Sequence, residues 1–384
     1  MDKIYYSNEI QSFFEEIVVE LRRVLDPEYI LIAGSFGKGS WIFDQEVLLS
    51  DFEFEFVCKS QWSRQKKTNL LRDLNQKFNF EIDLKGHLLP NVEKKILSNF
   101  GKKNQGYVNL NFFDTFSAPQ VLYAKNKKSL VIPIDNCEIP VWEAWRLYVN
   151  RIGEILEKIV NQNKNQHPEN YYWIKVFESI ADAYLIIHQI YRKNISERIL
   201  LFNKELLIKD KDLSDNCRNS YHFIRMALNA RKMHDISNLN IEISFDERVR
   251  IIQFWLKYFE KKLSDQEEIL PSKNDDFYEY YLKNVSLHKK YLEFTDNFAI
   301  ISSNLIRLVK NPKLINSRFK FYNLKKSWKH LILLAVSSYL NEYQDNNYMR
   351  TKNILINIIS RKEINLLTNQ ELLSKLIFYW KNLR

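Results

Sequence analysis

Residues 50–56 have the sequence SDFEFEF, in which acidic and phenylalanine side chains alternate without interruption from Asp51 to Phe56. Successive side chains of a β-strand point to opposite faces, so the pattern predicts a strand with Asp51, Glu53 and Glu55 on one face and phenylalanines on the other. Neighbouring like charges cost a few tenths to about 1 kcal/mol per facing pair unless a cation lies between them. The acidic face therefore indicates a site for hard metal ions, although a lone strand of this kind is usually a solvated face.

The flanking segments supply further parts of such a site. Residues 29–33 (YILIA) predict a short buried strand that leads into a loop over residues 34–40 (GSFGKGS). In that loop Gly34 lets the backbone approach a phosphate, Ser35 adds a hydroxyl donor, and Lys38 is a candidate phosphate contact. Residues 78–84 (FNFEIDL) predict another strand, from which Asp83 supplies a third carboxylate. Glu81 shares the face of Asp83 and is the alternative third acid.

This order of strand, Gly-Ser turn, acidic strand and third acid resembles the nucleotidyltransferase superfamily related to DNA polymerase beta, over roughly the first third of the chain. The resemblance implies that Gly34 and Ser35 hold a triphosphate. It also implies that Asp51, Glu53 and Asp83 ligate two Mg²⁺ ions, or Mn²⁺ in their place. Two features depart from the family pattern: the segment between Ser35 and Asp51 is long, and Glu53 stands where aspartate is commoner.

The implied reaction, displacement of pyrophosphate from a nucleoside triphosphate such as ATP by a hydroxyl group, explains these residue types. Two metal ions about 3.5–4 Å apart stabilise the attacking and leaving oxygens, and Mg²⁺ prefers oxygen ligands. Asp51 and Glu53 can bridge both ions, while Asp83 lies beside the attacking hydroxyl as ligand and possible base. Glu55 is expected to pair with a lysine or arginine rather than to bind metal.

Composition limits the class of protein. The chain has 384 residues, of which 45% are hydrophobic, enough for two domains with cores. Its formal charge of +10 favours anionic partners such as nucleotides or a single-stranded nucleic acid product, although codon bias towards Lys, Asn and Ile explains it equally well. Three separated cysteines favour neither zinc nor disulfides, and no long apolar run is present. We expect a cytoplasmic protein without a membrane segment.

Periodicity predicts an α+β protein. Apolar residues recur at helical spacing over residues 8–25, and residues 63–77 predict a second helix. Residues 121–123 and 130–132 are strand-like, and from residue 141 onward the pattern is helical. We predict a nucleotidyltransferase-type mixed sheet with flanking helices over residues 1–135, followed by an all-helical domain over residues 136–384.

Two basic residues of the helical domain are further candidates for nucleotide binding. The resemblance implies a basic residue on a helix after the catalytic domain, and Lys175 and Arg151 fit that description, although surface charges packed on aromatic neighbours are the simpler interpretation. Later basic residues can line a groove for a nucleic-acid strand, but solvated helix faces explain them better. They are Arg225, Arg231, Lys232, Lys325, Lys326 and Lys329.

Three functions fit this sequence. The first is a template-independent nucleotidyltransferase that makes a short oligonucleotide, as in bacterial antiviral enzymes that produce nucleotide signals; Tyr379 is a conceivable primer in a self-primed variant but more often a packing residue. The second is transfer of one nucleotide to a tRNA, a protein or a small molecule. The third is a nucleotide-binding module without catalysis. The base, the acceptor and the oligomeric state are not specified by the sequence.

Overall fold

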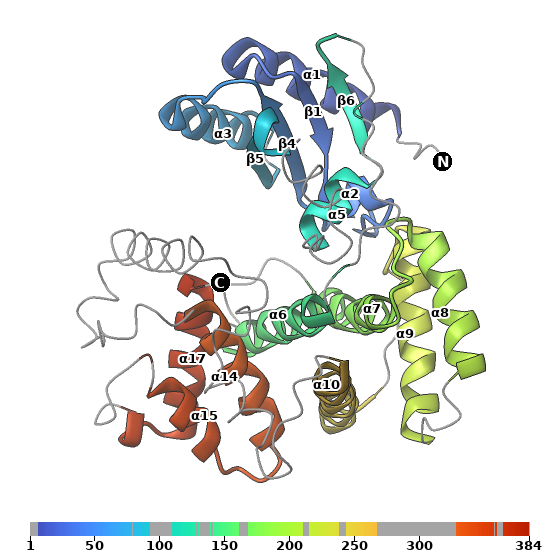
Figure 1. Cartoon of the computed structure of the whole chain (residues 1–384), viewed down its shortest axis with the longest axis vertical. Helices are drawn as coiled ribbons and strands as arrows, with labels where there is room; N and C mark the ends of the chain where they lie inside the picture. The colour runs from blue at the N-terminus through green and yellow to red at the C-terminus, as the bar shows by residue number, and fades with distance from the viewer. Residues whose placement is uncertain are drawn as a thin grey trace. The chain divides into compact units, whose positions relative to one another are not determined.

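Contacts divide the chain into two compact units. The computed structural model describes residues 7–78, 80–92, 110–117, 119–126, 130, 139, 141–160, 168–209, 215–237, 243–266, 328–356, 358 and 364–383. Unit 1 comprises Met1–Glu143, Leu185–Leu213 and Tyr221–Asn240, and unit 2 comprises Ala144–Tyr184, Ser214–Ser220 and Ile241–Arg384. The chain combines a small mixed sheet with many helices, which confirms the α+β class (Figure 1).

A four-stranded sheet in the order β5-β4-β1-β6 forms the centre of unit 1. Its strands are β1 (Tyr29–Ile32), β4 (Phe52–Cys58), β5 (Ile82–Leu88) and β6 (Gln120–Ala124). Strand β1 is antiparallel to both β4 and β6, whereas β4 is parallel to β5. A separate ribbon pairs β2 (Phe43–Asp44) with β3 (Val47–Leu48). The strands predicted from residues 29–33, 50–56 and 121–123 are thus confirmed, with shifts at their ends.

Helices α1 (Asn8–Leu25) and α3 (Arg64–Phe78) cover one face of this sheet (Figure 1). Ser7 caps the start of α1 through its hydroxyl, and Asp26 ends the helix in the left-handed conformation, with φ 44°. Apolar residues of both helices share a core with the phenylalanines of β4, namely Phe52, Phe54 and Phe56, each at most 2% exposed. The predicted aromatic face of this strand is therefore confirmed.

The strand predicted over residues 78–84 begins later than expected. Phe78 closes α3, and β5 starts at Ile82. The side chain of Asn75 explains the difference, because its Oδ1 accepts a hydrogen bond from the Ile82 amide at 2.9 Å while its Nδ2 donates to the Ile82 carbonyl. One side chain of α3 thus satisfies both backbone groups of the first β5 residue, which fixes where the strand begins.

Unit 1 also contains α2 (Gly34–Lys38), α5 (Leu110–Phe116), α8 (Ile195–Lys209) and most of α9 (Asp215–Met233). Unit 2 contains most of α6 (Val141–Val160) and α7 (Glu169–Ile187), together with α10 (Phe245–Gln266), α14 (Trp328–Glu342), α15 (Met349–Leu355) and α17 (Asn369–Leu383). Residues 131–138 lie outside the described residues, and with them the predicted boundary at 135–136 and most of the strand-like run 130–132.

The core of unit 2 contains fully buried Trp173, Trp255 and Trp380. Helix α6 approaches α17 so closely that a Cβ at Gly153 would collide with the Trp380 ring. Tyr379, on the same helix, is completely buried, which confirms its interpretation as a packing residue. The helical pattern predicted beyond residue 141 is confirmed wherever the structure describes it.

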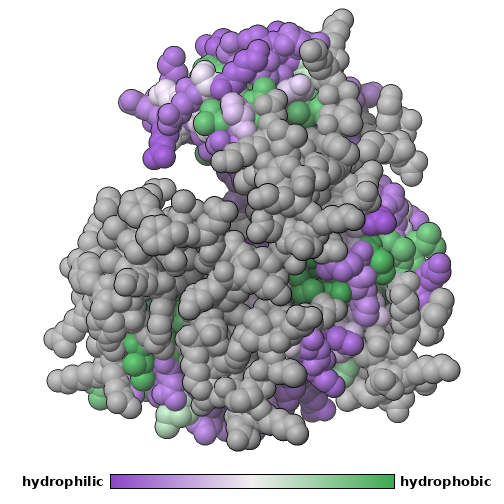
Figure 2. All heavy atoms as spheres, in the orientation of Figure 1, coloured by the Kyte–Doolittle hydropathy of each residue, from purple (hydrophilic) through white to green (hydrophobic). Residues whose placement is uncertain are grey.

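Hydrophilic side chains dominate the visible described surface near α1 and α3 (Figure 2). Across the helices that the structure describes, none combines the length and the apolar character needed to cross a membrane.

Candidate functional site

Strands β4 and β5 bring two of the predicted acids together. Their parallel register places Glu53 directly opposite Asp83, and residues in register share a face of the sheet. The next pair of facing residues on the same side of the sheet is Glu55 and Lys85. These two form an ion pair with an N–O distance of 3.2 Å, which confirms the geometry. Asp51 immediately precedes β4, two residues before Glu53. The three predicted acids therefore lie at one end of two neighbouring strands.

These acids do not form a compact cluster. Among the residues with described positions, no three His, Cys, Asp or Glu side chains gather closely enough to hold a metal ion. The Asp83 side chain is exposed, whereas Glu53 is half-buried against the turn that follows β1. Carboxylate oxygens are the ligands that Mg²⁺ prefers, so the donor type suits the ion. A metal site made of Asp51, Glu53 and Asp83 remains a prediction.

Gly34 makes room for the Glu53 side chain. Its φ of 57° lies in the left-handed region, and a Cβ at this position would collide with the Glu53 carboxylate. Just before the turn, the Ala33 amide donates to the Glu53 carbonyl at 2.8 Å. The φ angle and the collision favour glycine at position 34, and the Ala33–Glu53 hydrogen bond brings the predicted phosphate turn into contact with the predicted metal strand.

The loop predicted over residues 34–40 is a short helix at its start. Helix α2 runs from Gly34 to Lys38 and ends at Gly39, with φ 70°. The Ser40 amide donates to the Ser35 carbonyl at 2.8 Å, so backbone groups that a free loop would leave to solvent are paired. The Ser35 hydroxyl is buried and has no hydrogen-bond partner in the described part of the chain. Because a buried unsatisfied hydroxyl is costly, it fits a bound ligand with an acceptor oxygen.

Glu55 is neutralised within the sheet, as predicted. Its carboxylate lies 3.2 Å from the Lys85 ammonium and 2.6 Å from Nε2 of His87. Burial raises the pKa of Glu55, but the His87 hydrogen bond and the Lys85 charge outweigh it and hold the pKa below its usual value. His87 is therefore a structural partner of the Glu55 carboxylate. Glu81 is exposed just outside β5, and its place as the alternative third acid remains a prediction.

A basic cluster that the sequence analysis missed lies beside α2. Asp114 on α5 pairs with Lys38 at 3.6 Å and accepts a hydrogen bond from the Tyr191 hydroxyl at 2.9 Å. Lys193, 7% exposed, lies within range of the charges of Asp114, Lys38 and Glu55. Burial is the main reason that the pKa of Lys193 falls to about 8, since Asp114 acts in the opposite direction. Lys193 follows Arg192 in the short segment between α7 and α8, and no spacing in the sequence singles it out.

The two basic candidates of the helical domain share one carboxylate within unit 2. Arg151 lies 2.6 Å and Lys175 3.3 Å from oxygens of Glu154. Burial lowers the pKa of Arg151, but Glu154 and Glu178 raise it above its ordinary value. Lys175 also lies 4.7 Å from the ring centre of Tyr171, in keeping with packing on an aromatic neighbour. Contact of either residue with a nucleotide remains a prediction.

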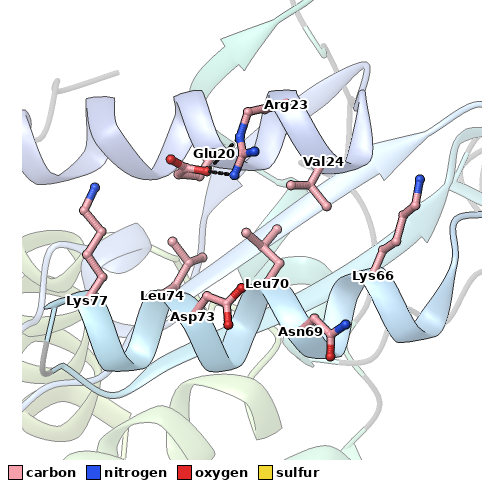
Figure 3. Close-up of a pocket in the computed structure, with 9 residues that line it drawn as sticks. All are labelled: Glu20, Arg23, Val24, Lys66, Asn69, Leu70, Asp73, Leu74 and Lys77. Carbon is pink, nitrogen blue, oxygen red and sulfur yellow. Dashed lines mark hydrogen bonds and ion pairs between the residues drawn. The ribbon is translucent and has the colours of Figure 1, made fainter.

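A surface groove of about 590 Å³ lies between α1 and α3 (Figure 3). Its charged residues are largely paired: Arg23 donates to Glu20 at 2.6 Å, and Lys77 lies 3.0 Å from Glu16. Both helices cover the phenylalanine face of the sheet, so the groove lies on the opposite side from Glu53. The groove is therefore separate from the site predicted from the sequence.

No protein-family model matches this chain, and no curated protein is significantly similar to it in sequence.

Proposed function

We propose that this protein is a metal-dependent, template-independent nucleotidyltransferase that joins nucleotides from nucleoside triphosphates and releases pyrophosphate. The observation that carries the proposal is the pairing of Glu53 with Asp83 on neighbouring strands, with the Glu53 carboxylate packed on Gly34. A like-charge pair is unfavourable unless a cation compensates it. This pair adjoins the turn of Ser35, whose buried hydroxyl has no hydrogen-bond partner among the described residues, and a phosphate oxygen of a metal-bound triphosphate would accept from it.

Each part of the site has a separate task in this proposal. Asp51, Glu53 and Asp83 would hold two Mg²⁺ or Mn²⁺ ions, which when bound stabilise the charge on the attacking and leaving oxygens. The Ser35 hydroxyl would donate to a phosphate oxygen. Lys38 and Lys193, which lie near the same Asp114 carboxylate, would supply positive charge beside the triphosphate.

The proposed bond changes are those of nucleotidyl transfer. The attacking hydroxyl oxygen bonds to the α-phosphorus, the bond from that phosphorus to the bridging oxygen breaks, and pyrophosphate leaves. Asp83, the most exposed of the paired acids, would accept the proton of the attacking hydroxyl. We propose a short oligonucleotide as product, in a cytoplasmic antiphage role that rests on the family resemblance alone. Transfer of one nucleotide to a tRNA, a protein or a small molecule would use the same site.

Product analysis tests the proposal directly. The protein is incubated with Mg²⁺ and each labelled ribo- and deoxyribonucleoside triphosphate, alone and mixed, and both pyrophosphate and products are measured. We expect pyrophosphate with a ladder or a cyclic product, and loss of both in Asp83→Asn. Asp73→Asn, an exposed acid on α3, is the matched control. No product with any nucleotide, with or without cell extract, would count against the enzyme.

A nucleotide-binding module without catalysis is the second candidate. The observation that favours it is the lack of a compact group of three metal-ligating side chains among the residues whose positions are described. This candidate predicts that triphosphate binding persists in the double variant Asp51→Ala, Glu53→Ala, with no turnover before or after the substitutions. An enzyme would instead lose turnover in that variant, so isothermal titration and pyrophosphate release together separate the two candidates.

A further inference from the structure

The end of α9 is hydrogen-bonded to the segment that follows α2, about 190 residues earlier in the chain. Nδ1 of His234 lies 3.0 Å from the Trp41 carbonyl. The Phe43 amide donates to the His234 carbonyl at 2.8 Å, and the Ile236 amide donates back to the Phe43 carbonyl at 3.0 Å. These are backbone contacts of the kind that joins strands, so the two segments are fixed in register.

Four aromatic rings form a stack that leads from α9 to the predicted metal strand. We call Phe52, Phe36, Trp41 and His234 the ring column. Successive ring centres are 4.5, 5.2 and 3.9 Å apart, and successive planes differ by 19°, 6° and 3°. Phe52 lies between Asp51 and Glu53 in the sequence, and Phe36 follows Ser35. Two members of the ring column are therefore direct sequence neighbours of predicted site residues.

A polar path runs beside the ring column. Arg231 is buried, with 4% exposure, and donates to the Ser40 carbonyl at 2.9 Å. The Ser40 amide in turn donates to the Ser35 carbonyl at 2.8 Å. Arg231 thus acts on Ser35 through one intervening residue. The interpretation of Arg231 as part of a solvated helix face or a nucleic-acid groove is wrong, because its guanidinium is held inside unit 1.

We propose that Arg231 and His234 are positioning residues for the predicted active site. Arg231 fixes Ser35 through Ser40, and His234 supports Phe36 and Phe52 through the ring column. The long segment between Ser35 and Asp51, which departs from the family pattern, is then a support held by α9 and not a mobile lid. The consequence for activity rests on the proposed function, whereas the mechanical coupling does not.

Hydrogen exchange measured by mass spectrometry tests the coupling without any assay of activity. In Arg231→Met we expect faster exchange of the amides in residues 33–43 and 51–58, with unchanged exchange in α1 and α3. Arg231→Lys, which retains a charged donor, should restore most of the protection. Arg64→Met, at the exposed start of α3, is the matched control. Exchange in Arg231→Met equal to that of the control would overturn the proposal.

His234→Phe keeps the test decisive if Arg231→Met does not fold. This variant retains a ring for the stack but lacks the contact to the Trp41 carbonyl, whereas His234→Ala loses both. We expect loss of protection in residues 33–43 to be small in the first variant and large in the second. Equal exchange in both variants and the wild type would contradict a role for the ring column.

Kinetics then tests whether the coupling serves the proposed reaction. A misplacement of about 1 Å in an active site can cost about 100-fold in rate, so we expect kcat for pyrophosphate release in Arg231→Met to fall about 10- to 100-fold. Leu74→Ala, in the core on α3, provides a variant that is destabilised without touching α9, and its kcat below the unfolding transition should be unchanged. A wild type without turnover would refute the proposed function, while exchange would still decide the coupling.

Discussion

Strands β4 and β5 place two pairs of facing residues, here called rungs, on the same side of the sheet, and the two rungs differ in charge. At Glu55 and Lys85 the two strands place opposite charges together, and His87 completes a buried network. At Glu53 and Asp83, two residues earlier, the same strands place like charges together beside Gly34. The first pair joins opposite charges, whereas the second is the place where we propose that a metal ion binds. The comparison separates an acid paired within the sheet from the acids that we propose for metal binding.

Turning the second rung into a copy of the first should have the largest effect. In Asp83→Lys the new ammonium would pair with Glu53 as Lys85 pairs with Glu55. We expect pyrophosphate release to fall by about 100-fold or more, because a metal ion contributes several kcal/mol of transition-state stabilisation. The free energy of unfolding should be unchanged or higher by about 0.2–1 kcal/mol. Steady-state kinetics and urea denaturation measure the two effects, and undiminished turnover would contradict a metal role for this rung.

Removal of the Lys193 charge should have the second largest effect. Lys193 lies near Glu55 of the first rung and near Lys38 on α2. Removing its charge in Lys193→Met should raise KM for the triphosphate about 10- to 100-fold, as expected for loss of a charged contact worth about 1.5–3 kcal/mol. Lys204→Met, at an exposed position of α8, is the control.

The pH dependence of KM sharpens this prediction. Because the pKa of Lys193 is about 8, its positive charge is present below that pH and is lost as pH rises through it. KM of the wild type should therefore increase above pH 8, whereas KM of Lys193→Met should vary less over the same range. A parallel profile in both proteins would assign the titration to another group.

Breaking the first rung should affect stability more than catalysis. Glu55→Gln removes the charge shared by Lys85 and His87, and we expect the free energy of unfolding at neutral pH to fall by about 1–3 kcal/mol. Turnover at temperatures below unfolding should change much less than in Asp83→Lys. Urea denaturation with Asp73→Asn as control checks this, and a larger loss of turnover than of stability would place Glu55 among the functional acids.

The smallest effect is expected from Glu81→Gln, which tests the alternative third acid. Glu81 is exposed outside β5, while Asp83 lies in register with Glu53. Pyrophosphate release by Glu81→Gln should therefore equal that of the wild type. If this variant instead lost activity while Asp83→Asn retained it, the third acid would have to be reassigned.

The sequence predicts local features of unit 1 well. Alternation correctly gives Phe52, Phe54 and Phe56 as core residues, because the face of a strand residue depends on the period of that strand alone, and the expected pairing of Glu55 is confirmed by Lys85 of the neighbouring strand. The start of β5 was missed because it is set by Asn75, a side chain on another element.

Long-range contacts explain what the sequence could not predict in the site. Lys193 approaches Asp114, and Arg231 approaches Ser40, only through the fold of the whole unit. Neither residue belongs to a recognised motif, and each lies in or next to a helix. Periodicity within a segment carries no information about such pairs, so only the three-dimensional structure reveals them.

The interrupted path of unit 1 along the chain limits how the protein can be dissected. A fragment ending near residue 135 would keep every strand of the sheet but would lack Lys193, Arg231 and His234. Trp41, 7% exposed in the intact chain, would lose the imidazole that covers it and present an indole to water. Such a truncated product should aggregate more readily than the full-length protein, so expression trials aimed at the amino-terminal part should retain the chain through α9.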